Sequence, residues 1–393
     1  MAPLTLGWLH IIALLGAIQG VFLAGVLATK RTNRTANRLL AVTIAAFSIH
    51  LASTVYYATG FERVAPHFFG VAHPLPFLYG PLLYLYAVTA ADRSRRLTRR
   101  DLLHFVPFIA VVITGLPIYL MSGAEKIALY QQIKLGDVPF IITVTVPLKL
   151  VSGIVYAGAT LLFLRRHRDQ VKESYSTTDR VNLRWLMWLG AGAAIIWMMA
   201  IVIQTLEATG IATIQPGDDL ISVAMALMVY GIGYMGLRQP EVFRYETAEH
   251  RVPVELLRAE PPPPEPEAPR YERSGLGDRE AERLKSSLLA VMDKEQPWRQ
   301  SELTLAELAD MLSTTPHKLS EVINGQLDQT FYDFVNGYRV REVQRRIAAG
   351  EAKRLTILSL ALDAGFASKS TFNVVFKKHT SQTPSDYRQT VGA

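Results

Sequence analysis

Two groups of residues in this sequence are of types that do chemistry, and their surroundings differ. Lys149, His50 and Glu207 stand within or at the end of long apolar runs. Near the C-terminus, polar and basic residues recur at helical spacing: His317, Lys318, Ser320, Glu321 and Asn324, then Lys369, Ser370, Thr371, Asn373 and Lys377. Lysine and asparagine can reach guanine and adenine edges, whereas serine and threonine more often hold phosphates. The second group therefore suits a nucleic-acid surface.

Several classes of function have no support in the sequence. The chain has no cysteine, which excludes disulfides, cysteine-ligated zinc, iron–sulfur clusters and thiol nucleophiles. It shows no catalytic triad, phosphate loop, HExxH motif or paired carboxylates, and His67 and His73 have no carboxylate nearby to complete a metal site. We expect no enzyme, no cofactor and no metal.

The N-terminal half is too apolar for an ordinary soluble domain. The whole chain is 50% hydrophobic and only 19% charged, where a soluble domain carries about a quarter charged residues. Up to Arg238, seven apolar runs have the length that a bilayer-spanning helix requires. These runs lie near residues 7–28, 39–59, 71–90, 102–121, 140–164, 184–206 and 219–237. The expected fold is all-α, with a seven-transmembrane-helix bundle over residues 1–238.

The basic residues in the loops predict the orientation of this bundle. Fourteen lysines and arginines lie in the loops after the first, third and fifth runs, against three in the opposite loops. Positive charge marks the cytoplasmic side. We therefore expect a multi-pass protein of a bacterial inner membrane, with its N-terminus outside and its C-terminal part in the cytoplasm.

Lys149 is the clearest candidate for sensing a signal. It stands nine residues into its apolar run, about 13 Å from the outer end of the helix. Ionisable residues at such depth are costly and are often functional. Lys149 can form a site for an anionic or polar ligand with His50 and Glu207 near it. The alternative is a structural lysine paired with a carboxylate or with backbone carbonyls.

Gly16, Gly20, Ala24 and Ala28 form a stripe of small residues in the first run. Such a stripe allows close helix packing, either inside the bundle or between two copies of the chain. We favour packing inside the bundle.

The character of the sequence changes after Arg238. Residues 261–269 read PPPPEPEAP, which suits an extended polyproline spacer. We treat 239–275 as a linker and 276–393 as one soluble all-α domain.

Residues 303–324, LTLAELADMLSTTPHKLSEVIN, have the pattern of two short helices joined by a turn. Apolar residues from Leu305 to Leu312 share one face, and Ser313–Thr315 interrupts them. Pro316 suits a first helical position, with the threonine before it as the N-cap. The spacing is typical of a helix-turn-helix, although a plain helical hairpin has the same pattern.

Residues 357–378, ILSLALDAGFASKSTFNVVFKK, repeat this pattern. Gly365 suits the left-handed residue that ends a helix, and a second helix begins near Ser368. Residues 331–348 between the two units form a long amphipathic helix. Two such units joined by one long helix can place two recognition helices in successive major-groove segments.

The C-terminal sequence resembles the DNA-binding domain of AraC/XylS-type bacterial transcription regulators over residues 278–390. The residues that carry the resemblance are Phe331, Tyr338, Arg339, Ala361, Gly365, Phe366, Ser368, Phe372, Phe376, Lys377, Lys378 and the run from Thr383 to Arg388. Ser313 and Ser381 stand where glycine is usual, and Val343 stands where alanine is usual. The resemblance implies a set of DNA-contacting residues on the two recognition helices: His317, Lys318, Ser320, Asn324, Lys369, Ser370, Thr371, Asn373 and Lys377. Glu321 lies on the same expected exposed side of the first recognition helix.

The charge distribution agrees with this interpretation. Residues 276–336 carry a net charge of −5, and residues 337–393 carry +6. A positive field on the second half supplies the salt-dependent attraction to phosphates.

The two halves together predict a membrane-tethered transcription regulator that binds promoter DNA sequence-specifically under the control of a signal sensed in the membrane domain. Expected partners are double-stranded promoter DNA, the lipid bilayer and an unknown small-molecule or envelope signal. RNA polymerase and a second copy of the chain, forming a homodimer, are further candidates. Two alternatives remain open: a transporter-like or receptor membrane protein with a regulatory cytoplasmic appendage, and a passive anchor that only confines a regulator.

Overall fold

The structure of the chain is a computed structural model. It describes residues 7–31, 33–92, 95–177, 184–209, 217–238 and 277–391. The regular secondary structure of these residues is helical, apart from one isolated antiparallel bridge between Tyr175 and Thr304. The expected linker, 239–275, lies outside the described residues. Two compact units are present, one made of described residues up to Arg165 together with 184–238, and the other of 166–177 together with 277–391.

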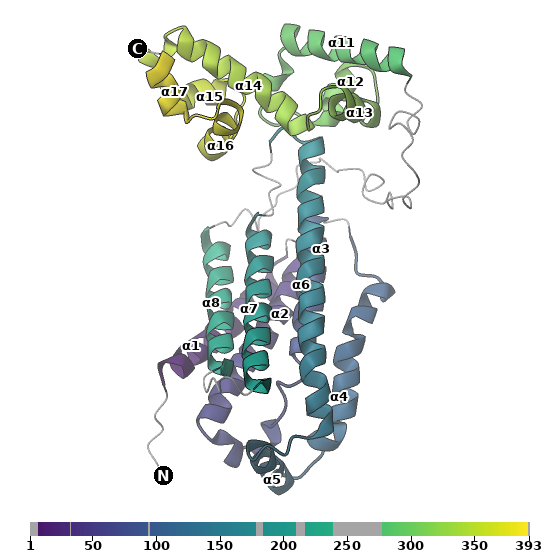
Figure 1. Cartoon of the computed structure of the whole chain (residues 1–393), viewed down its shortest axis with the longest axis vertical. Coiled ribbons are helices and arrows are strands. Elements are labelled where there is room, and N and C mark those ends of the chain that lie inside the picture. The colour runs from purple at the N-terminus through teal and green to yellow at the C-terminus, as the bar shows by residue number, and fades with distance from the viewer. Residues whose placement is uncertain are drawn as a thin grey trace. The chain divides into compact units, whose positions relative to one another are not determined.

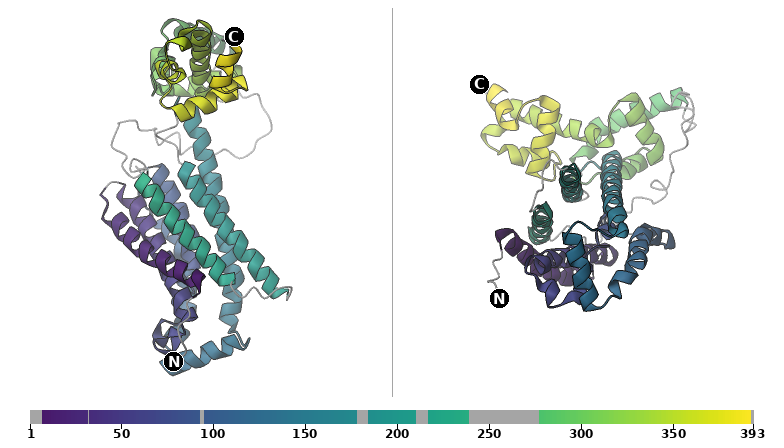
Figure 2. Two further views of the ribbon diagram at one scale, coloured as in Figure 1. Left: turned by 90° about the vertical axis from the view of Figure 1, so that its left-hand side faces the viewer. Right: turned by 60° about the horizontal axis from the view of Figure 1, so that its bottom comes forward.

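The first unit is a bundle of apolar helices (Figure 1). Its core lies where α1 packs along α2 and α8, and where α2 also contacts α3 and α8 (Figure 2). Among the described residues of this unit, short 3-10 helices join the longer ones: η1 (Phe61–Arg63), η2 (Pro66–Phe68) and η3 (Arg99–Phe105). The α-helices are α1 (Trp8–Thr29), α2 (Arg34–Ala58), α3 (Pro76–Ala91), α4 (Val106–Tyr119), α5 (Gly123–Lys134), α6 (Phe140–Ser174), α7 (Arg184–Ala208) and α8 (Gly217–Arg238). The end of α6, from Arg166, belongs to the second unit.

Close packing of small residues builds the centre of this bundle. A Cβ atom added to Gly16 would lie 2.7 Å from the Cβ of Ala226 in α8, and one added to Gly20 would collide with the Ser48 hydroxyl in α2. Both glycines therefore face neighbouring helices of the same chain. At these two positions the expectation of packing inside the bundle is confirmed.

Five helical segments of the described chain are long and apolar enough to cross a membrane, where seven were expected. They are Trp8–Thr29, Arg34–Ala58, Arg99–Tyr119, Phe140–Ser174 and Trp185–Leu206. The other two expected spans correspond to shorter apolar helical segments, Pro76–Ala91 and Leu220–Ile232.

The second unit contains two helix pairs at opposite ends of one long helix (Figures 1 and 2). The first pair is α12 (Leu305–Met311) and α13 (Pro316–Gln326), and the second pair is α15 (Ile357–Asp363) and α16 (Lys369–Thr380). The helix between them, α14 (Phe331–Ala348), has 18 residues and is about 27 Å long. The remaining elements are α11 (Asp278–Lys294), η5 (Pro297–Arg299), η6 (Glu351–Lys353) and α17 (Pro384–Val391).

The apolar periodicity predicted the core of this unit correctly. Leu308, Leu319, Phe334 and Phe376 are all buried in one cluster that also takes in Trp298. Because these residues come from both helix pairs and from α14, the two pairs share a continuous apolar core.

Candidate nucleic-acid interface and helix-bundle cavity

The turn of each helix pair has the same backbone motif. In the second pair, the Gly365 N–H donates to the Leu362 carbonyl at 2.9 Å and the Phe366 N–H donates to the Ala361 carbonyl at 3.0 Å. This is a Schellman motif, in which the residue after the C-cap is left-handed, and Gly365 has a φ of 91°. The sequence prediction of a left-handed residue at Gly365 is confirmed.

The first pair forms the same motif without a glycine. The Ser313 N–H donates to the Asp310 carbonyl, the Thr314 N–H donates to the Ala309 carbonyl, and Ser313 has a φ of 50°. Ser381, which follows α16, is also left-handed, with a φ of 60°. Two of the positions where the sequence departs from the usual glycine therefore keep the glycine conformation.

Side-chain caps fix the start of the second helix in each pair. The Thr315 hydroxyl accepts from the Lys318 N–H, and the Ser368 hydroxyl accepts from the Thr371 N–H. Pro316 occupies the first position of α13, as its fixed φ favours. These local contacts place α13 and α16 directly after their turns, as in a helix-turn-helix.

The predicted DNA-facing residues of α13 differ in how freely they reach solvent. His317 and Asn324 are exposed, whereas Ser320 is half-buried and its hydroxyl accepts from the Asn324 amide at 3.2 Å. Lys318 donates to the Glu280 carboxylate of α11 at 2.8 Å. Both carboxylate oxygens of Glu321 are shielded from solvent and have no hydrogen-bond partner among the described residues. The expectation that Glu321 lies on the exposed side of α13 is therefore wrong.

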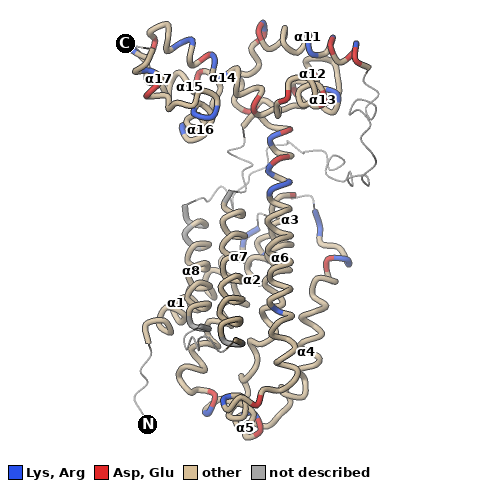
Figure 3. Tube along the Cα trace, in the orientation of Figure 1, with Lys and Arg blue, Asp and Glu red and all other residues tan. Residues whose placement is uncertain are grey.

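The predicted residues of α16 form a more open surface. Lys369, Ser370, Asn373 and Lys377 are all exposed. Thr371 is half-buried, and its hydroxyl accepts from the hydroxyl of the N-cap Ser368 at 3.2 Å. Figure 3 shows basic residues on α16. The second helix pair thus offers two lysines and an asparagine to a negatively charged partner.

Two basic residues outside the predicted set are held by carboxylates. Lys378 donates to Asp333 of α14 at 2.6 Å. Arg346 bridges Glu351 and Asp363 at 2.7 and 3.1 Å. The excess of positive charge in residues 337–393 is therefore only partly available to bind phosphates.

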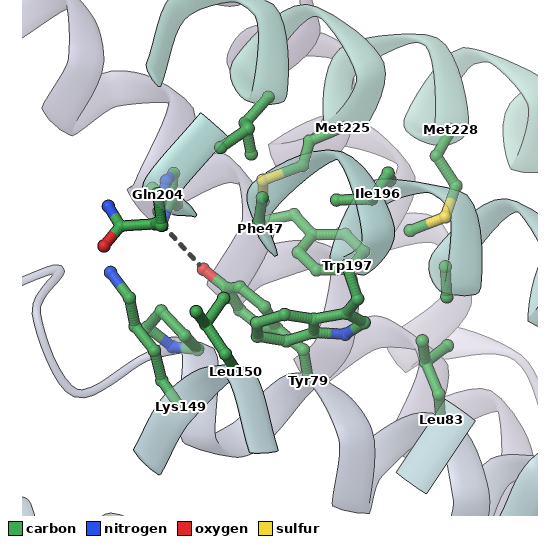
Figure 4. Close-up of a pocket in the computed structure, with 15 residues that line it drawn as sticks. Phe47, Tyr79, Leu83, Lys149, Leu150, Ile196, Trp197, Gln204, Met225 and Met228 are labelled. Atoms are coloured by element: carbon green, nitrogen blue, oxygen red, sulfur yellow. Dashed lines mark hydrogen bonds between the residues drawn. The ribbon is translucent and has the colours of Figure 1, made fainter. Parts of the chain in front are cut away.

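In the first unit, a cavity of about 80 Å³ lies among α2, α3, α6, α7 and α8 (Figure 4). Lys149 and His50, which the sequence singled out, both line it, and His50 Nδ1 shares a hydrogen bond of 3.0 Å with the Tyr79 hydroxyl. The side chain of Glu207, the third predicted sensing residue, lies outside the described residues. The other lining residues are Phe47, Pro76, Leu83, Leu150, Ala193, Ile196, Trp197, Ala200, Gln204, Ile221, Met225 and Met228.

The polar and apolar groups of this cavity lie at different ends. In Figure 4, Lys149 and Gln204 point toward one another at one end, and Leu83, Ile196 and Met228 lie toward the other. Sequence analysis missed Gln204 and Tyr79. Both are polar residues within apolar runs, which is the signal that singled out Lys149.

Comparison with known proteins identifies the second unit. Residues 308–390 match a family model described as a helix-turn-helix domain. That range covers nearly all of both helix pairs and the helix that joins them. The C-terminal part of this chain is therefore a helix-turn-helix DNA-binding domain. Its type is that of the AraC transcription regulators, as the sequence resemblance implied.

No curated protein and no solved structure matches the chain.

Proposed function

We propose that this protein is a membrane-tethered transcription regulator that binds promoter DNA sequence-specifically through α13 and α16. The observation that carries the proposal is the matched helix-turn-helix domain in one chain with long apolar helices. We propose further that the apolar unit crosses a bacterial inner membrane seven times, with its N-terminus outside and the DNA-binding domain in the cytoplasm.

The outer surface of the apolar helices supports a membrane location. Only 6% of the apolar window in Arg99–Tyr119 and 17% of that in Phe140–Ser174 are buried. Exposed apolar side chains such as Ile113 and Val155 would be unfavourable in water over so large an area. Lipid chains would cover them. Because α8 has 22 residues, it reaches about 33 Å and is long enough to span as well.

We propose that the cavity around Lys149 binds the signal. Its cationic and amide groups at one end suit an anionic group, and its apolar walls suit a hydrocarbon body. The volume of about 80 Å³ is several times the roughly 15 Å³ that one water needs, so a short-chain carboxylate or one end of a longer amphiphile fits the size. A ligand changes DNA binding only if it binds the two states of the protein with different affinity.

Chromatin immunoprecipitation of the intact, tethered chain tests DNA binding. The test variant carries Lys369→Ala and Lys377→Ala, and the matched control carries Lys285→Ala and Lys294→Ala on α11, which remove the same charge elsewhere. We expect discrete peaks for the native chain and the control, and their loss in the test variant. Equal peaks in both variants, or none in the native chain under many growth conditions, would contradict the proposal and favour a transporter-like protein with a regulatory appendage.

A chimaera tests the sensing role. The membrane unit is exchanged for an unrelated anchor, and the transcription of bound genes is measured as growth conditions vary. We expect the chimaera to lose its response while it still binds DNA. An unchanged response would mean that the membrane unit is a passive anchor.

A further inference from the structure

The residues that follow α6 are bound into the DNA-binding unit. Tyr175 forms an antiparallel bridge with Thr304, the N-cap of α12. The Ser176 N–H and hydroxyl both donate to the Leu303 carbonyl, at 3.1 and 2.6 Å. The Thr177 hydroxyl donates to the Ser301 carbonyl. Ser176 is completely buried, whereas Tyr175 and Thr177 are half-buried, so the segment is anchored in the interior of this unit through Ser176.

A buried arginine of α14 binds the same segment. Arg339 is 1% exposed, and its Nη1 and Nη2 donate to the Ser176 carbonyl and hydroxyl at 3.2 and 3.1 Å. The Asn336 amide donates to the same carbonyl at 2.9 Å. Arg339 also donates to the Trp298 and Gln300 carbonyls, each at 2.7 Å.

A buried guanidinium needs an acceptor for each of its donors. Carbonyl, amide and hydroxyl oxygens of the described part of the chain accept from Arg339 and compensate its charge. Burial lowers the pKa of Arg339 to about 10, which still leaves it charged at neutral pH. Removing Ser176 would leave Nη1 and Nη2 of Arg339 without the Ser176 carbonyl and hydroxyl as acceptors.

The segment binds where the two helix pairs meet. Leu303 and Thr304 lead into α12 of the first pair. The Trp298 carbonyl, which accepts from Arg339, also lies against Gly365 in the turn of the second pair, since a Cβ there would be 2.5 Å from it. Arg339 itself is on α14, which joins the two pairs.

We propose that residues 175–177 are a built-in peptide ligand of the DNA-binding domain, clamping α14 and the start of α12 in the arrangement that binds DNA. Tyr175 follows directly on α6, which contains one of the candidate membrane spans and Lys149. A change in α6 therefore reaches the two recognition helices through the chain itself. This inference rests on the proposed function, since the arrangement it controls is the one that binds promoters.

Disulfide trapping in the full-length chain tests the docking without reference to DNA. Because the chain has no cysteine, a pair introduced by Tyr175→Cys and Thr304→Cys is the only pair of thiols. Bridged residues lie about 4.5–5.5 Å apart, within reach of a disulfide. Membrane vesicles are treated with a mild oxidant, and the thiols that remain are counted by mass tagging. The control pair is Gln170→Cys with Thr304→Cys, because Gln170 is exposed on α6.

We expect most of the first pair and little of the control pair to become oxidised. Equal oxidation of the two pairs, or no oxidation of the first, would overturn the docking. This result does not depend on whether the protein regulates transcription, so a failure of the proposed function is distinguishable from a failure of the docking.

A second variant tests what the docking does. Ser176→Trp cannot fit a completely buried serine site, yet it leaves residues 277–391 unchanged; Gln170→Trp is the matched control. We expect Ser176→Trp to lower promoter occupancy about tenfold, because charge-assisted bonds to Arg339 are lost, and to speed amide exchange at 298–304 and 336–340. The control should match the native chain. Unchanged or increased occupancy would overturn the clamp. If the native chain gives no immunoprecipitation peaks, the amide-exchange measurement decides alone. Unchanged amide exchange in Ser176→Trp would then overturn the clamp.

Discussion

Replacing Gly365 by alanine should destabilise the DNA-binding domain more than a left-handed backbone alone explains. Gly365 has a φ of 91°, and an added Cβ would lie 2.5 Å from the Trp298 carbonyl oxygen and 2.8 Å from that of Arg299. Both neighbours are backbone atoms, which cannot rotate away as a side chain can. Gly350 is the matched control, because its φ is 80° and an added Cβ would meet nothing within 4 Å.

The two substitutions separate two costs. A left-handed conformation costs an L-residue about 1–2 kcal/mol, of which a lower entropy of the unfolded chain returns about half. Gly350→Ala should therefore lose about 1 kcal/mol. Forcing an extra carbon into a packed site adds about 1–3 kcal/mol, so Gly365→Ala should lose about 3 kcal/mol. For a domain of 115 described residues, 277–391, a loss of about 1 kcal/mol lowers the unfolding midpoint by roughly 4 °C. The midpoint should therefore fall by about 4 °C in Gly350→Ala and by about 12 °C in Gly365→Ala.

Thermal proteolysis of the full-length chain in membrane vesicles measures these shifts. An epitope at the C-terminus reports cleavage of the DNA-binding domain independently of the apolar unit. Equal midpoints for the two variants would refute the reasoning, since they would mean that the backbone at Trp298 moves away without cost. No shift in Gly350→Ala would refute the conformational part.

Three further outcomes follow from the same domain. Ser313→Gly and Ser381→Gly should each stabilise it by up to about 1 kcal/mol, because glycine adopts their positive φ without strain; a lower proteolysis midpoint would contradict this. Lys377→Ala should weaken DNA binding for all sequences alike and reduce the slope of log affinity against log salt by about 0.9, as expected for one lost phosphate contact; an unchanged slope would exclude a phosphate contact. The hydrogen bond from Arg345 lowers the pKa of Glu342 below its ordinary 4.5, although burial opposes it. The stability that this carboxylate contributes is present above pH 4.5 and is lost as the pH falls through its lowered pKa. Glu342→Gln should therefore make the free energy of unfolding fall less steeply at acid pH. An equally steep fall in the variant would show that Glu342 contributes little.

The sequence by itself determined the helices of the DNA-binding domain and their pairing. Thr315 was recognisable as an N-cap, and a helix start was recognisable near Ser368, because a cap bonds backbone groups only two or three residues away. The glycine at 365 and the apolar periodicity located the second turn and the core in the same way. These are local interactions, so a single sequence contains the information needed to predict them.

The tertiary structure decided which of the residues predicted to be exposed are free to contact a ligand or DNA. Lys318 has the same helical spacing as a base-reading residue, but Glu280, 38 positions earlier, holds its ammonium group. Nothing near Gln204 in the sequence indicates that it shares a cavity with Lys149. Such contacts depend on how the helices pack, and helix packing brings together residues that lie far apart in the sequence. A short sequence pattern indicates only which residues share a face of one helix.

Arg339 shows the same division most clearly. Its place in a family motif was visible in the sequence, yet its partners were not. It is charged, and composition alone would place it at the surface. Only folding brings Ser176, 163 positions away, to its guanidinium. A buried charge needs acceptors, and Ser176 in the segment that follows α6 supplies two of them, its carbonyl and its hydroxyl.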